Sequence, residues 1–199
     1  ILIQFGHASA EFVARDVGAD VLHIKGAAVD PAANPLRPAG SDADVLVRPA
    51  HVRRFMRGLA DAGWVLWCDF DEGSRFEHAA SLHHPVYGML DVHQNFPGIH
   101  TAAERNFETL WSRRVTRTVA GIACPVLDGL GERLVLLLHA ARTSPSHIDL
   151  ENHWNSLSDA ERTELIAFAE SMGARVGLAV ATGRADEVRG DPELPLWEL

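Results

Sequence analysis

Two aspartates at the start of a strongly apolar segment constrain this chain more than any other feature of its sequence. Asp42 and Asp44 alternate with small residues, and the apolar run 45–47 follows at once. In a β-strand, residues i and i+2 point to the same face, so the two carboxylates project side by side. Adjacent carboxylates repel each other unless a cation lies between them. Mg²⁺, or Mn²⁺ in its place, takes oxygen ligands, so the segment predicts a divalent metal site where a buried strand begins.

A third carboxylate is expected on a neighbouring strand. Asp91 is the best candidate, because it lies among apolar residues of a second predicted strand, where an unpartnered charge would be costly. His93 follows on the same face and would either support this carboxylate or contact the substrate. Asp69 and Asp71 compete for the third position, but their surroundings are typical of an exposed acidic turn. We therefore assign the third position to Asp91.

A lysine and a glycine after the first predicted strand are typical of a turn that handles phosphate. Lys25 is the single lysine among 18 Lys and Arg residues. Gly26 would let the backbone approach a triphosphate closely, and the amides at a helix N-terminus favour anions. Arg37 and Ser41 precede the aspartates and would add a cation and a hydroxyl on the phosphate side. An exposed lysine before a turn glycine is the alternative interpretation.

The composition is that of a soluble globular protein. The chain has 199 residues, of which 47% are hydrophobic and 23% charged, and its net charge is −9. That charge argues against a protein that grips long nucleic acid by phosphate neutralisation. No apolar run approaches the roughly 18 residues of a membrane-spanning helix. Cys68 and Cys124 match neither a CxxC motif nor zinc spacing, which predicts reduced thiols in a cytoplasmic protein.

The spacing of apolar residues, glycines and prolines predicts an α+β core followed by helices. Strands are expected at 21–25, 42–47, 64–68, 75–83, 87–96, 114–119 and 122–126. Helices are expected at 8–17, 49–62, 102–111, 130–142, 149–156, 158–171 and 174–181. Ser158 is typical of an N-cap for one of these helices. We therefore divide the chain into a core at 1–128 and a C-terminal helical region at 129–199.

In their order and spacing, these motifs resemble the DNA polymerase β-like nucleotidyltransferase superfamily, and within it a family of uncharacterised bacterial nucleotidyltransferases. The shared features are a strand ending in Lys-Gly, an arginine before an Asp-x-Asp strand, a helix closed by Gly-Trp, and a later Asp-x-His strand. In this chain the matching positions are Lys25, Gly26, Arg37, Asp42, Asp44, Gly63, Trp64, Asp91 and His93. One difference is that the Gly-Ser usual in the superfamily is replaced here by Lys25, Gly26 and Ala27.

The resemblance implies a polymerase β-like nucleotidyltransferase core, a mixed sheet with helices, followed by a C-terminal helical annex. It implies an enzyme that moves a nucleoside monophosphate from an NTP to an acceptor and releases pyrophosphate. Asp42, Asp44 and Asp91 would hold two metal ions. Lys25 and Arg37 would neutralise the charge that builds on the leaving pyrophosphate. The remaining contacts to the nucleotide would come from Gly26, Ser41 and His93.

Two other functions stay open on the sequence. One is a non-catalytic module that binds nucleotide or a partner with the same fold. The other is a toxin-type enzyme that modifies tRNA ends or a protein, although the acidic composition argues against the tRNA version. The acceptor, a small molecule or a protein, is not indicated. No HExxH or HxH spacing supports zinc, so the roles of four further histidines are open. These are His78, His83, His84 and His139.

Overall fold

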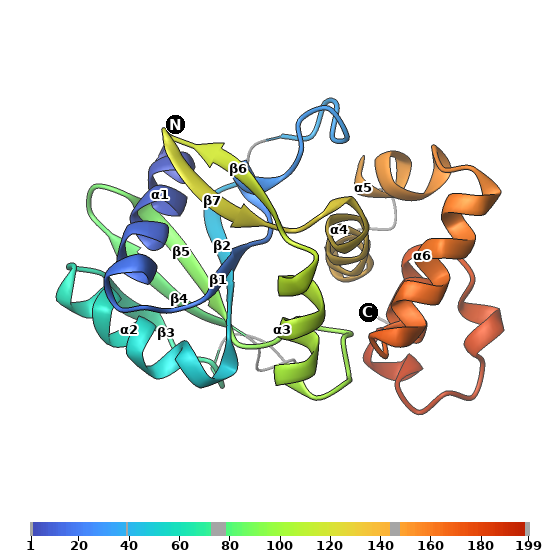
Figure 1. The fold of residues 1–199 in the computed structure, drawn as a ribbon. Helices are drawn as coiled ribbons and strands as arrows, with labels where there is room; N and C mark the ends of the chain where they lie inside the picture. Colours follow the sequence, from blue (N-terminus) through green and yellow to red (C-terminus); the bar gives the residue numbers. More distant parts are fainter. Residues whose placement is uncertain (1, 39, 73–78, 144–147, 198–199) are drawn as a thin grey trace. The chain divides into compact units, whose positions relative to one another are not determined.

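The computed structural model describes residues 2–38, 40–72, 79–143 and 148–197 (Figure 1). The chain forms two compact units. The first comprises Ile1–Val29, Pro38–Phe96 and Ala102–Asp128, and the second comprises Asp30–Arg37, Pro97–Thr101 and Gly129–Leu199. Two short segments between elements of the first unit thus belong with the C-terminal helices. No helix in the described ranges has the length and apolar character needed to cross a membrane.

Seven strands of the described residues form one mixed sheet in the first unit. They are β1 (Val21–His23), β2 (Asp42–Val47), β3 (Val65–Cys68), β4 (Ala79–His84), β5 (Gly88–His93), β6 (Val115–Val119) and β7 (Ile122–Val126). Their spatial order is β3-β4-β5-β2-β1-β7-β6. The pairs β2–β5 and β1–β7 are parallel, and the other neighbouring pairs are antiparallel. The expected mixed sheet with helices is confirmed.

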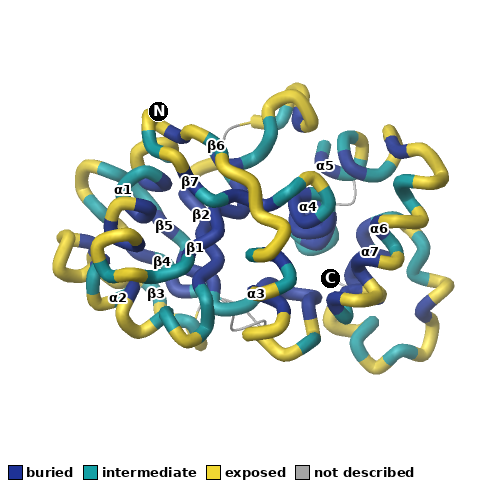
Figure 2. Tube along the Cα trace, in the orientation of Figure 1, coloured by how far each residue is buried: buried dark blue, intermediate teal, exposed yellow. Residues whose placement is uncertain are grey.

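Two helices, α1 (Leu2–Asp16) and α2 (Val52–Asp61), share a core with one face of the sheet (Figure 1). Alternate residues of β2, such as Ala43 and Val45, are fully buried in this core. Leu90 and Val92 lie opposite them on β5 and belong to the same core. The two central strands β1 and β2 are buried along almost their whole length (Figure 2). Because side chains alternate along a strand, the intervening residues of β2 and β5 project from the other face.

The first helix begins earlier than the sequence predicts. We expected a helix at 8–17, but α1 starts at Leu2. The extra turns are held against the sheet by a close approach at Gly6. A Cβ added there would lie 3.1 Å from the Cβ of Ala43, so glycine lets the helix backbone come close to β2. The remaining elements of this unit are α3 (Ala103–Ser112) and the 3₁₀ turns η1 (Gly26–Ala28) and η2 (Pro49–His51).

Helices make up the second unit. They are α4 (Gly129–Thr143), α5 (Ile148–Leu150), the π-helical turn η3 (Glu151–Asn155), α6 (Asp159–Ser171), α7 (Arg175–Ala181) and the 3₁₀ turns η4 (Ala185–Val188) and η5 (Leu194–Leu196). The predicted cap of α6 is confirmed. Ser158 Oγ accepts a hydrogen bond from the Glu161 amide at 3.4 Å, and the Glu161 carboxylate accepts one from the Ser158 amide at 2.9 Å.

Buried polar side chains attach the segment Asp30–Arg37 to the helices of this unit. The side-chain amide of Asn34 donates to Glu132 at 2.7 Å, and its carbonyl oxygen accepts from His153 Nε2 at 2.7 Å. Burial is the main cause that lowers the pKa of His153 from its ordinary 6.5 to about 4. His153 is therefore neutral in the folded protein near pH 7, where its ring nitrogen donates to Asn34.

We expect His153→Gln to reduce the pH dependence of stability. The unfolded chain takes up a proton on His153 below about pH 6.5, whereas the folded chain resists it until about pH 4. Stability from this residue is therefore complete above pH 6.5 and is lost as the pH falls toward 4, by about 1.4 kcal/mol per pH unit inside that window. Glutamine keeps a donor for Asn34 but does not titrate. Urea unfolding between pH 4 and 7.5 checks this, and equal slopes for both proteins would contradict it.

Candidate active site

Asp44 and Asp91 lie directly opposite each other on the parallel strands β2 and β5. Asp42, two residues earlier, shares their face and is half-buried. His93 also projects from this face, and ligand atoms of Asp44, Asp91 and His93 lie within 4.8 Å of one another. The structure therefore places the three predicted carboxylates and His93 on the face of the sheet opposite the core of α1 and α2.

Two cationic or polar partners bind the same oxygen of Asp44. Lys25 Nζ lies 2.5 Å from Asp44 Oδ1, and His93 Nε2 donates to this oxygen at 3.0 Å. Burial alone would raise the pKa of Asp44, but the Lys25 charge and the His93 contact hold that pKa well below its usual range. The carboxylate is therefore ionised. Since both lone pairs of Oδ1 are engaged, Oδ2 is the oxygen that remains for a metal ion.

Asp91 is in the opposite electrostatic situation. Burial raises its pKa to about 6, and the charges of Asp44 and Asp42 act in the same direction. The Ser81 hydroxyl on β4 opposes this effect, because it donates to Asp91 Oδ1 at 2.6 Å. A carboxyl with a pKa near neutrality accepts a proton or a cation readily. Ser81 was missed in the sequence, where its only signal is its place in the predicted strand 75–83.

The turn after β1 brings Lys25 to the acids. The Lys25 side chain is largely buried. The Ile24 amide donates to the Asp44 carbonyl at 3.1 Å, so the backbone stays beside β2 as far as the residue before Lys25. Gly26 follows with φ of +60°, where a side chain would be strained. A Cβ added there would also lie 3.2 Å from the Asp42 carbonyl oxygen. Glycine is therefore required by both conformation and space.

Two predicted phosphate contacts have other partners in the structure. Ser41 is exposed, and its hydroxyl donates to Asp42 Oδ1 at 3.2 Å. Arg37 belongs to the second unit, where its Nε donates to Asp149 Oδ1 at 2.8 Å in a buried ion pair. The role of Arg37 on phosphate stays a prediction.

Three other histidines that the sequence singled out lie within the described residues and are not part of this group. His84 stacks on Tyr87, with ring centroids 4.5 Å apart, and His83 is exposed on the same strand. His139 lies on α4 in the second unit. His78 is outside the described residues.

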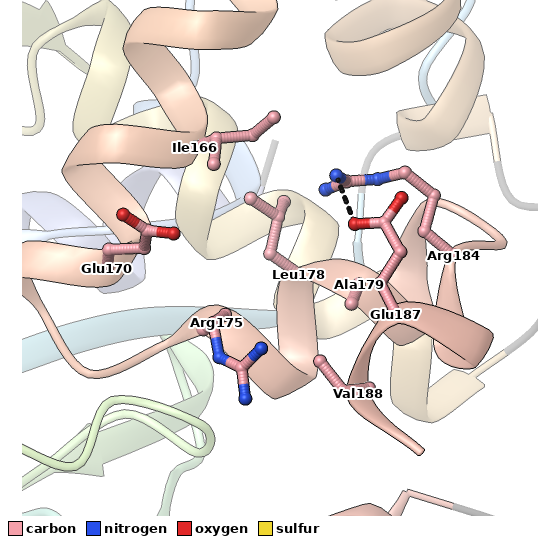
Figure 3. Close-up of a pocket in the computed structure, with 8 residues that line it drawn as sticks. All are labelled: Ile166, Glu170, Arg175, Leu178, Ala179, Arg184, Glu187 and Val188. Atoms are coloured by element: carbon pink, nitrogen blue, oxygen red, sulfur yellow. Dashed lines mark hydrogen bonds and ion pairs between the residues drawn. The ribbon is translucent and has the colours of Figure 1, made fainter.

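Figure 3 shows a pocket of the second unit that residues of α6, α7 and η4 line. Its volume is about 110 Å³. Two of the residues that line it, Arg184 and Glu187, form an ion pair. Ligand pockets for drug-sized molecules run from roughly 300 Å³ upward. The pocket is therefore too small for a nucleotide, and none of the acidic residues of β2 and β5 line it.

A sequence model of an uncharacterised nucleotidyltransferase family matches residues 15–188. The chain belongs to this family. The match includes the strands that carry Asp42, Asp44 and Asp91 and confirms the resemblance inferred from their spacing. The search of curated proteins found no match.

The solved structures that match this chain include an antibiotic-resistance factor and an antibiotic adenylyltransferase. The antibiotic-resistance factor ANT(2'')-Ia matches with a TM-score of 0.52 and 13% identity, over 82% of this chain and 89% of that one. The lincosamide antibiotic adenylyltransferase LnuA with lincomycin bound gives 0.49 and 19%, over 76% and 95%. A nucleotidyltransferase-like protein of Paracoccidioides brasiliensis gives 0.45 and 13%, over 98% and 91%. At these identities, the likeness to ANT(2'')-Ia shows the fold alone.

The donor set on this face fits a divalent cation. Two carboxylates and one imidazole lie close enough to share an ion. Carboxylates suit Mg²⁺ and Mn²⁺, and imidazole binds transition metals more readily than Mg²⁺. A cation would also relieve the repulsion that raises the pKa of Asp91.

We expect Asp91→Asn to weaken Mn²⁺ binding by on the order of tenfold or more, because the amide removes one of the two facing charges. A titration with Mn²⁺ that follows the paramagnetic resonance signal of the free ion measures this affinity directly. Asp71→Asn, on the turn after β3, is the matched control and should bind like the wild type. Equal affinities for the Asp91 variant and the wild type would place the ion elsewhere.

Proposed function

We propose that this protein transfers a nucleoside monophosphate from an NTP to a hydroxyl of a small molecule or protein, with release of pyrophosphate. One observation supports the proposal above the others. Asp44 and Asp91 face each other on adjacent parallel strands, and the Lys25 ammonium lies 2.5 Å from Asp44. This arrangement combines ligands for divalent cations with a positive charge for phosphate, in a chain that belongs to a nucleotidyltransferase family.

The carboxylates would hold the metal ions. Asp42 and Asp44 would bridge two Mg²⁺ ions, and Asp91 would bind the ion on the acceptor side. When bound, such a pair stabilises the attacking and the leaving oxygens of an in-line displacement. His93 keeps Asp44 oriented by donating to Oδ1, so that Oδ2 stays available. Ser81 does the same for Asp91 from the neighbouring strand.

Lys25 and Gly26 would serve the phosphates. The lysine ammonium is a compact charge that can stabilise negative charge on the leaving pyrophosphate. Gly26 lies at the start of η1 and would bring the backbone of this turn to the phosphates. The exposed Ser41 hydroxyl, which here donates to Asp42, would turn to the phosphates when nucleotide binds.

Asp91 is also suited to take the proton of the acceptor hydroxyl. A general base works best when its pKa lies near the working pH. In the metal-free site, burial raises the pKa of Asp91 to about 6, which meets this condition better than the lowered pKa of Asp44. We therefore give the two carboxylates different roles, with Asp44 as a permanent anion and Asp91 as a proton acceptor.

Asp44→Asn should lower Mg²⁺-dependent transfer by on the order of 10³-fold or more while the protein stays folded. The assay incubates the purified chain with Mg²⁺ and each labelled NTP, together with a fractionated cell extract. The readouts are labelled product and released pyrophosphate.

The wild type and Asp71→Asn should both transfer label, and circular dichroism should show that Asp44→Asn is folded. Transfer at the wild-type rate by Asp44→Asn would refute the metal assignment. Metal-dependent NTP binding by the wild type without pyrophosphate release, across all extract fractions, would favour the non-catalytic module.

Lys25→Arg should reduce turnover by on the order of tenfold or more, although it keeps the charge. The side chain is only 11% exposed and shares one carboxylate oxygen with His93, so a planar guanidinium with five donors does not fit the same contacts. Steady-state kinetics with the NTP found in the screen measures the effect. Undiminished activity would show that any cation suffices at this position.

A further inference from the structure

Three ionisable side chains that the proposed reaction does not use form a buried chain on the other face of the sheet. Glu11 and His7 lie one helical turn apart on α1, and His23 ends β1. Glu11 Oε2 lies 3.2 Å from His23 Nε2, and His23 Nδ1 lies 2.9 Å from His7 Nδ1. All three are at most 5% exposed. Groups of this kind are costly to bury, and the contacts between them offset part of that cost.

The direction of the hydrogen bonds in this chain is set by Glu11. Arg15 Nε donates to Glu11 Oε1 at 2.7 Å, so the Glu11 carboxylate is an acceptor in this ion pair. An ionised carboxylate only accepts, so His23 Nε2 must donate to it. His23 Nδ1 and His7 Nδ1 then share a single proton between them. Glu11 thus fixes the ring of His23, and His23 fixes the tautomer of His7.

The far nitrogen of His7 faces the turn that carries Lys25. Within the described residues, His7 Nε2 has no hydrogen-bond partner of ordinary geometry, although the ring is fully buried. A Cβ added to Gly26 would lie 3.2 Å from this nitrogen. Burial and then His23 lower the pKa of His7 to about 3, while the Asp44 charge and a hydrogen bond with the Lys25 backbone act in the opposite direction. A neutral imidazole is therefore aimed at the backbone of Lys25 and Gly26.

We propose that Glu11, His23 and His7 are positioning residues that hold the Lys25–Gly26 turn, so that the Lys25 ammonium is aligned with Asp44 before substrate binds. A lysine side chain has four flexible carbons, and holding its backbone limits where the ammonium can go. Small displacements of a catalytic group reduce turnover strongly, so such a device has a clear benefit. The effect on turnover rests on the proposed function, whereas the effect on Lys25 itself does not.

The single lysine of the chain makes this testable without any substrate. The full sequence has a single lysine. Protein labelled with isotopic carbon at lysine Cε therefore gives one lysine signal in an NMR spectrum, that of Lys25. His7→Leu removes both ring nitrogens and replaces the ring by an apolar side chain of similar size. Glu11→Gln leaves the helix intact and removes the charge that orients the chain. We expect both variants to shift and broaden the Lys25 signal.

Matched substitutions separate the two nitrogens of His7. His7→Asn retains a polar group near the place of Nδ1, and His7→Gln retains one near the place of Nε2. The proposal requires the Gln variant to stay closer to the wild-type Lys25 signal than the Asn variant. His153→Gln, another buried histidine in the second unit, is the control and should leave the signal unchanged.

Kinetics supply the second readout. In the His7 and Glu11 variants, kcat should fall on the order of tenfold or more, with a smaller change in KM for the NTP. An unchanged Lys25 signal in folded His7→Leu and Glu11→Gln would overturn the proposal and leave these residues as packing. Shifted signals in a protein whose wild type transfers nothing would uphold the positioning and refute the nucleotidyl transfer.

Discussion

The repulsion between the carboxylates of Asp44 and Asp91 is the interaction on which the rest of the site depends. The two side chains are forced together by the register of β2 and β5, and Asp44 is almost fully buried. Burial alone would push both toward the neutral form. Lys25 resolves the conflict at Asp44, and its position follows from the pairing of β1 with β2. The pairing of these strands therefore brings the lysine to the buried carboxylate.

The alternation of side chains gives the two faces of the sheet separate tasks. Ala43 and Val45 pack into the core with α1 and α2, while Asp42 and Asp44 project from the opposite face. A register slip of one residue would bury the acids and expose the core. His23 is opposite Val45, so it faces the helices, and the two residues that follow it lead the chain to Asp44. The chain of Glu11, His23 and His7 thus approaches the acids at the turn after β1.

Much of the fold and the acidic part of the site could be predicted from the sequence, because both follow from a period of two. Asp-x-Asp and Asp-x-His each place two side chains on one face, and the apolar residues between them identify the buried side. The parallel pairing that sets Asp44 opposite Asp91 could not be predicted, since it depends on strand order. The partner of Arg37 was missed for the same reason, because Asp149 is 112 residues away in sequence. The spacing of His7 and Glu11 was a signal in the sequence, but the predicted helix began one residue after His7.

The number of carboxylate oxygens around each cation explains why this chain has a lysine at position 25 and arginines elsewhere. Arg37 meets both oxygens of Asp149, and Arg48 meets three carboxylates, of Asp20, Glu104 and Glu108. A guanidinium with five donors is satisfied in such places. Lys25 instead meets one oxygen, which His93 also occupies, in a site where an unpaired donor would be buried. An ammonium can keep that single contact and still turn its remaining donors toward phosphate, so lysine is the cation that this geometry selects.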